Sequence, residues 1–63
     1  DDETLRQAAE EAIAQNPQSV QDYHKGKDRA IGFLVGQTMK AMKGRADPLR
    51  VRGLLREMLQ KAP

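Results

Sequence analysis

GFLVGQTMKAMKG, residues 32–44, is the stretch that decides the fold class. Its leucine, methionine, alanine, glutamine and lysine residues favour a helix. Two glycines, Gly32 and Gly36, lie inside it, although an interior glycine costs a helix roughly 1 kcal/mol relative to alanine. Gly44 is typical of a left-handed helix terminator. The stretch therefore predicts a helix whose glycines allow a close approach, either of a neighbouring helix or of a binding partner.

The patterns on both sides of this stretch also indicate helices. Thr4 to Gln7 reads as a capping box at the start of a first helix. Asn16-Pro17 ends that helix and begins a second, with Asn16 as the cap and Pro17 in the first turn. Asp47-Pro48 is the same combination of cap and proline and predicts the start of another helix. No stretch alternates with the period of a strand. We predict an all-α fold in one domain, residues 1–63, a small bundle of three to four helices at about 3–15, 17–25, 27–43 and 48–61.

Helical spacing assigns one face of each predicted helix to a shared core. The third helix has the widest apolar arc, and the second is short. The expected core residues are Leu5, Ala8, Ala9, Ala12 and Ile13; Val20 and Tyr23; Ala30, Ile31, Leu34, Val35, Thr38, Ala41 and Met42, with Met39 at the edge; and Val51, Leu54, Leu55, Met58 and Leu59.

The overall composition restricts the class of protein. The chain has 63 residues and no cysteine, so neither a disulfide framework nor a thiolate metal site is expected. No apolar run is long enough to span a membrane, and no signal peptide is visible. The chain starts without a methionine, and we expect a cytosolic protein or a domain excised from a longer one.

The charge is unevenly distributed along the chain. Residues 1–24 carry six acidic residues and one basic residue, a formal charge of −5, whereas residues 25–63 carry ten basic and three acidic residues, a charge of +7. This asymmetry indicates either a basic half that faces a polyanion or two halves that attract each other within the fold.

The side of the third helix away from its core arc has an unusual composition. It combines the cations Arg29, Lys40 and Lys43 with Phe33 and Gly36, and Gly32 borders it. A phosphate or ribose could approach the bare backbone, the cations could neutralise phosphate charge, and Phe33 could stack on a base or lie against a sugar. The structural alternative is that Phe33 packs on the first helix and the glycines make room for it.

Catalytic residues are not evident in the sequence. His24 is the only histidine, and we expect it to help satisfy carbonyl groups at a helix end. No serine has a nucleophile context and no residues have metal-ligand spacing, so we expect no catalytic, cofactor or metal site and no enzymatic activity in this chain. The loop of residues 43–48 places two bases around a glycine before a helix N-terminus, which indicates a phosphate site.

Many of these residues together resemble a known family. They are Asn16-Pro17, Val20, Tyr23, Gly26-Lys27, Ala30, Gly32-Phe33-Leu34-Val35-Gly36-Gln37, Met39-Lys40, Lys43-Gly44, Ala46, Pro48 and Leu54-Leu55. Over about residues 10–60, the chain is similar to the GatB/YqeY tail module, which forms the C-terminus of the B subunit in aspartyl/glutamyl-tRNA(Asn/Gln) amidotransferases.

The resemblance implies a non-catalytic tRNA-binding tail that helps to position and select misacylated tRNA(Gln) or tRNA(Asn) for transamidation. The parent enzyme would be a carbon–nitrogen ligase that uses ATP, Mg²⁺ and glutamine and contains other amidotransferase subunits. It would lie in the cytoplasm, or in an organellar matrix in a eukaryote. We predict the following tRNA-binding residues: Lys25, Lys27, Arg29, Gly32, Phe33, Gly36, Lys40, Lys43 and Arg45.

Two alternatives remain at this point. The first is a helical module that docks on protein without touching RNA, within the enzyme or in a stand-alone protein of the YqeY type. The second is binding to a membrane surface, which is disfavoured because tryptophan is absent and the apolar stripes have the width of an intramolecular core.

Overall fold

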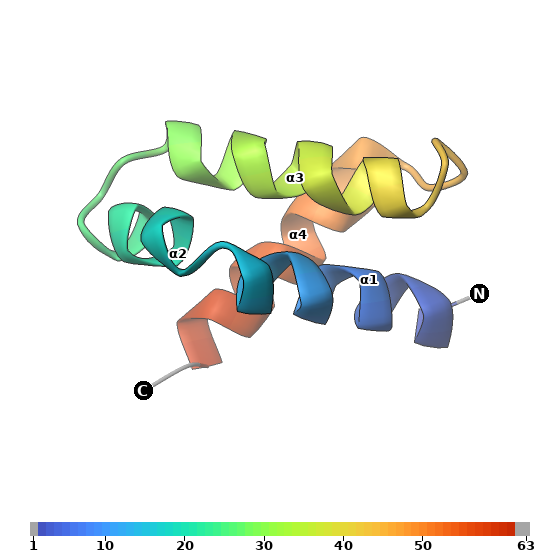
Figure 1. Ribbon diagram of the computed structural model, residues 1–63, viewed down its shortest axis with the longest axis horizontal. Coiled ribbons are helices and arrows are strands. Elements are labelled where there is room, and N and C mark those ends of the chain that lie inside the picture. The colour runs from blue at the N-terminus through green and yellow to red at the C-terminus, as the bar shows by residue number, and fades with distance from the viewer. Residues whose placement is uncertain (1, 62–63) are drawn as a thin grey trace.

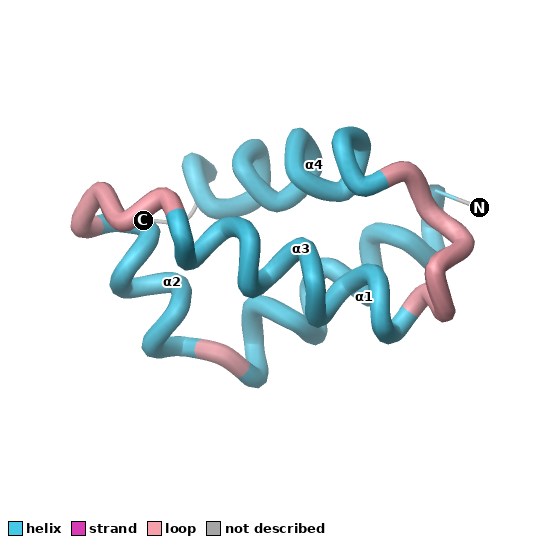
Figure 2. Tube along the Cα trace, turned by 90° about the horizontal axis from the view of Figure 1, so that it is seen from above, coloured by secondary structure: helices cyan, strands magenta, loops and turns pink. Residues whose placement is uncertain are grey.

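Four helices account for most of the chain in the computed structural model, which describes residues 2–61 (Figure 1). They are α1 (Asp2–Gln15), α2 (Pro17–His24), α3 (Arg29–Ala41) and α4 (Pro48–Lys61). Helix α3 contacts all three others, and Figure 2 shows it between α1 and α4. The described residues contain no strand, which confirms the predicted all-α bundle.

The core lies where α1, α3 and α4 meet. Leu34 of α3 and Val51 and Leu55 of α4 are fully buried, and most of the predicted core residues are buried or half-buried around them. Thr38 is the one buried polar residue among those described, and its hydroxyl donates to the carbonyl of Leu34 at 2.8 Å. Ala41 was predicted in the core but is exposed, because it borders an open groove between α1 and α3.

The junction between α1 and α2 differs from its prediction. Asn16 precedes Pro17, which occupies the first turn of α2 as expected. The Asn16 side chain does not cap α2, however, because its amide donates instead to the carbonyl of Ala12 at 2.8 Å. Asn16 therefore satisfies a terminal carbonyl of α1, which has no intrahelical partner there.

The other two predicted N-caps have different outcomes. Helix α1 already begins at Asp2, so Thr4 lies inside the helix and the capping box at its start was wrong. At α4 the prediction is confirmed, because the carboxylate of Asp47 accepts the N–H of Leu49 at 3.0 Å.

The ends of α2 and α3 share a hydrogen-bond pattern but differ in the residue that adopts the left-handed backbone. At α2, Gly26 has φ 90°, and the N–H of Lys27 donates back to the carbonyl of Asp22 at 3.0 Å. Because Lys27 completes α2 in this way, α3 begins at Arg29 and not at 27 as predicted.

At the end of α3, the left-handed position is taken by a lysine. The N–H of Lys43 donates to the carbonyl of Lys40 at 3.1 Å, and the N–H of Gly44 to that of Met39 at 2.9 Å. Lys43 has φ 56° and Gly44 φ 74°. The predicted left-handed termination is therefore confirmed at Gly44, but the left-handed backbone already begins at Lys43. Helix α3 ends at Ala41 as a result.

Arg50 and His24 each make a polar contact with a residue far away in the sequence. Arg50 of α4 forms an exposed ion pair with Asp2 at the start of α1. Nε2 of His24 lies 3.1 Å from the carbonyl oxygen of Leu59, which can only accept, so this nitrogen carries the proton. His24 thus satisfies a helix-end carbonyl as expected, although the carbonyl belongs to α4 and not to its own helix.

None of the helices within residues 2–61 combines the length and the apolar character that a membrane span needs.

Candidate nucleic-acid interface

The exposed side of α3 carries the predicted binding residues in one stripe, which we call the α3 face: Arg29, Gly32, Phe33, Gly36 and Lys40. Helical geometry places them together because they are spaced three or four residues apart. All five are exposed, whereas the neighbouring Ile31 and Leu34 are buried on the opposite side of the helix. The α3 face is therefore the outer surface of the helix that forms the centre of the bundle.

The two glycines of the α3 face do not make room for another helix of this chain. A Cβ atom added at Gly32 or at Gly36 would have no heavy atom within 4 Å outside its own local helix. Phe33 is 48% exposed. The glycines therefore do not make room for packing of Phe33 on the first helix, as the alternative supposed, and the bare backbone faces the outside of the molecule.

We expect Gly36→Ala to raise the free energy of unfolding by about 0.5–1 kcal/mol, because alanine lowers the backbone entropy cost of an interior helix position. The new methyl group has open space at this position. The urea midpoint of the circular-dichroism transition measures the change.

Gly26→Ala is the matched control for this substitution. Gly26 also has open space around it, but its φ of 90° disfavours any side chain, so stability is expected to fall. A destabilised Gly36→Ala variant would show that the α3 face is not open.

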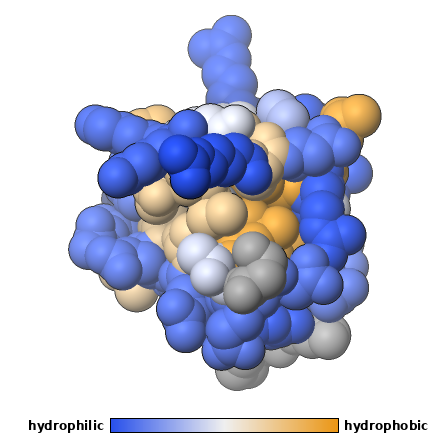
Figure 3. Space-filling view, turned by 90° about the vertical axis from the view of Figure 1, so that its right-hand side faces the viewer, coloured by the Kyte–Doolittle hydropathy of each residue, from blue (hydrophilic) through white to orange (hydrophobic). Residues whose placement is uncertain are grey.

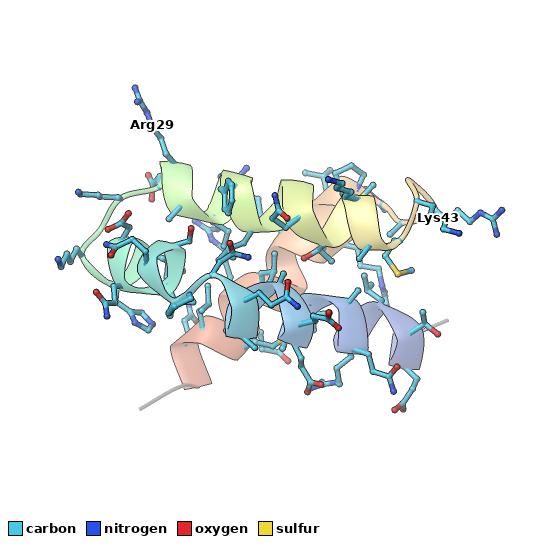
Figure 4. All side chains as sticks on the ribbon, viewed as in Figure 1. Arg29 and Lys43 are labelled. Atoms are coloured by element: carbon cyan, nitrogen blue, oxygen red, sulfur yellow. The ribbon has the colours of Figure 1, made fainter. Side chains whose placement is uncertain are left out.

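Three exposed cations lie on α3 and just beyond its C-terminal end. No ion pair within the described part of the chain includes Arg29, Lys40 or Lys43. Figure 4 shows Arg29 and Lys43 at opposite ends of α3, both pointing away from the bundle. With 13 residues, α3 is about 20 Å long, so these charges can contact phosphates of different nucleotides.

The predicted residues that precede α3 have a more mixed environment. Lys25 is the C-cap residue of α2, and both it and Lys27 are exposed. Lys27 and Arg29 line an open hollow of about 440 Å³ together with Asp22 and Asp28. The two carboxylates partly offset the positive charge of Lys27 and of Arg29 at this end of the α3 face.

Arg45, at the other end of α3, belongs to a different surface. It lines a hollow of about 220 Å³ at the end of the bundle where α1 begins, and Figure 3 shows apolar surface there framed by hydrophilic residues. The hollow is formed by Asp2, Leu5, Met42, Arg45, Ala46, Asp47 and Arg50. The carboxylate of Asp47 already accepts the N–H of Leu49, so it occupies the helix N-terminus at which we expected a phosphate.

Gln37 is a candidate that the sequence reasoning did not include. It is exposed one turn after Phe33, and with Lys40 it borders an open groove of about 280 Å³ between α1 and α3. Its amide group can both donate and accept hydrogen bonds. Its spacing of four residues from Phe33 could have identified it.

The exposed side of α1 has the opposite charge. Glu3, Glu10 and Glu11 are exposed and lie away from the buried Leu5 and Ala9. The domain therefore has an acidic outer side on α1 and a basic outer side on α3. Within residues 2–61 no group of three or more His, Cys, Asp or Glu side chains could hold a metal ion.

Comparison with known proteins gives consistent matches over nearly the whole chain. The model of a family described as "GatB domain" matches residues 1–59. The B subunit of the aspartyl/glutamyl-tRNA(Asn/Gln) amidotransferase of Lachnoclostridium phytofermentans is 55% identical over 62 residues, which are 98% of this chain and 13% of that protein. The corresponding proteins of Bacillus licheniformis and Lachnospira eligens are 57% and 58% identical, over 97% and 95% of this chain.

The chain thus spans only about an eighth of the length of these relatives, 12–13%. No solved structure matches it.

Proposed function

Because this chain belongs to the GatB domain family, we propose that it is the non-catalytic tRNA-binding tail of the B subunit in an aspartyl/glutamyl-tRNA amidotransferase. Its role is to hold misacylated tRNA(Gln) or tRNA(Asn) through the α3 face while the rest of the enzyme carries out transamidation. The parent enzyme acts with its other subunits, in the cytoplasm of a bacterium like those that contain the relatives.

One observation carries this proposal: the α3 face combines exposed cations, which form no ion pair within residues 2–61, with an exposed aromatic ring and bare backbone. Phosphate contacts from lysine and arginine provide much of the affinity for nucleic acids. Bare backbone and an aromatic ring allow a ribose or a base to approach closely. A lysine-rich helix that only faces solvent requires neither bare backbone nor an exposed aromatic ring.

The catalytic chemistry belongs elsewhere in the proposed parent enzyme. The only histidine, His24, is bonded to the carbonyl of Leu59, and we assign no residue of this chain to the binding of ATP, Mg²⁺ or glutamine. A tail that only binds tRNA needs no such residues.

An NMR titration of the isotope-labelled chain with unmodified tRNA, at low and then moderate salt, tests the proposal. We expect chemical-shift changes centred on residues 25–45 that diminish as the salt concentration rises, because phosphate contacts release counterions. Absence of shift changes at low salt would contradict direct RNA binding by this surface. It would favour the second candidate, a protein-docking module, since the half-exposed Phe33 could also anchor a protein.

A further inference from the structure

Phe33 is exposed in a domain that has few aromatic residues to bury. The chain contains one phenylalanine and one tyrosine, and no tryptophan. Tyr23 packs against the core, whereas Phe33 is 48% exposed, although the adjacent Leu34 is fully buried. Burial of an aromatic ring is a strong source of stability. A small domain that leaves its phenylalanine outside the core has this ring available for a ligand.

The backbone on both sides of this ring is bare. Gly32 directly precedes Phe33, and Gly36 lies one turn after it, with open space at both Cβ positions. A planar group that lies against the ring of Phe33 therefore meets no side chain from these two positions. The helix surface beside Phe33 is therefore open at both glycine positions.

Cations lie on both sides of this surface. Arg29 is four residues before Phe33 and Lys40 is seven residues after it, at distances of about 6 and 10 Å along the helix axis. Neither forms an ion pair in the described part of the chain. Both side chains are long and flexible, so their charged groups can reach toward the phosphates on either side of one ribose.

From this juxtaposition we infer that α3 binds one unstacked nucleotide of an RNA, with its base stacked on Phe33. The ribose lies over the backbone at Gly36, and the flanking phosphates contact Arg29 and Lys40. The inference rests on the proposed function and adds the structural class of RNA that is recognised: a loop or bulge with an unpaired base, not a continuous duplex.

A protein partner fits the same surface less well. A helix that docks in a groove presents apolar side chains at several positions one turn apart. The exposed neighbours of Phe33 at this spacing are Arg29, Gly36 and Gln37, none of which has an apolar side chain. Phe33 would be the single apolar anchor, next to charges that an apolar partner would have to desolvate.

The test compares two RNA probes of equal length and charge, a hairpin with an unpaired loop and a blunt-ended duplex. We expect Phe33→Leu to weaken binding of the hairpin about tenfold, because loss of base stacking has an effect of this size. Binding of the duplex is expected to stay within about twofold, since its bases are not available to stack and its phosphates are unaffected. Phe33→Tyr, which keeps the ring, retains the hairpin affinity.

A tryptophan at the same position reports the stacking directly. Phe33→Trp adds the only tryptophan of the chain, and we expect its fluorescence to be quenched by the hairpin and not by the duplex. We expect Gly36→Ala to stabilise the domain but to lower its affinity for the hairpin, because the added methyl group lies where the ribose approaches. Leu49→Ala, at a site 77% exposed and outside the α3 face, serves as the control and leaves hairpin affinity unchanged.

Equal binding of hairpin and duplex, or a Phe33→Leu variant with full hairpin affinity, would overturn the inference that a base stacks on Phe33. In that case salt-dependent binding of both probes would still support the proposed function. Failure of both probes to bind the unaltered chain at low salt would instead reject the proposed function itself. Circular dichroism verifies that each variant keeps its helices.

Discussion

Leu34→Ala is expected to remove most or all of the stability of this domain. Leu34 is fully buried at the centre of α3, the helix that contacts every other helix. Replacement of a buried leucine by alanine costs about 2–5 kcal/mol, because the transfer free energy is lost and a cavity remains. A domain of this size has a free energy of unfolding of only about 3–9 kcal/mol, so we expect a variant that is largely unfolded or melts at a much lower temperature.

Leu49→Ala removes the same atoms from a side chain that is 77% exposed, and it provides the matched control. Its free energy of unfolding is expected to stay within about 0.5 kcal/mol of the unaltered chain. Thermal and urea unfolding followed by circular dichroism measure both variants. A Leu34→Ala variant as stable as Leu49→Ala would mean that α3 does not pack against the other helices through the side that carries Leu34.

The second large effect is expected from reversal of two charges on the α3 face. Arg29→Glu with Lys40→Glu replaces two phosphate contacts by repulsion, and we expect a 10- to 100-fold loss of tRNA affinity at moderate salt. The slope of the logarithm of affinity against the logarithm of salt concentration is expected to decrease by about two, one for each lost phosphate contact. The measurement is a salt series of tRNA dissociation constants in an intact amidotransferase that carries this domain.

Arg52→Glu with Arg56→Glu is the control for net charge. Both pairs of substitutions change the formal charge of the chain from +2 to −2, and Arg52 and Arg56 are exposed on α4. Only the α3 pair is expected to change the salt slope by two. Equal losses from both pairs would indicate general charge attraction, and no loss from the α3 pair would reject the α3 face as the site.

The helices and most of the core could be predicted because the information is local. Pro17 and Pro48 mark helix starts, and the spacing of apolar residues on α3 separates Leu34 from Phe33. Helix ends were less predictable where one residue can act on either side of a junction. The Asn16 side chain has both a donor and an acceptor group, and its amide donates a hydrogen bond to the carbonyl of Ala12 in the preceding helix. At Lys43 the hydrogen-bond pattern, and not the preference of glycine, sets the left-handed position.

The candidate site could be predicted in composition but not in exposure. Periodicity places Arg29, Phe33 and Gly36 on one side of α3, yet it does not determine whether another helix covers that side. The structure answers this question because Arg29, Phe33 and Gly36 are all exposed, so none of the described helices covers that side. The environments of Lys27 and Arg45 depend also on Asp22 and on the start of α1, which the backbone geometry of the junctions brings near them and the sequence pattern does not.

The opposite charges of the α1 and α3 sides also affect how the domain meets a polyanion. Glu3, Glu10 and Glu11 on one outer side and Arg29 and Lys40 on the other give the domain an electric dipole. In the electric field of a nucleic acid, this dipole orients the α3 side toward the nucleic acid before any contact forms, because the α1 side is repelled. Such orientation raises the rate of association more than the lifetime of the complex, and added salt reduces it. In the proposed complex with tRNA, the acidic helix would thus speed the encounter without touching the RNA.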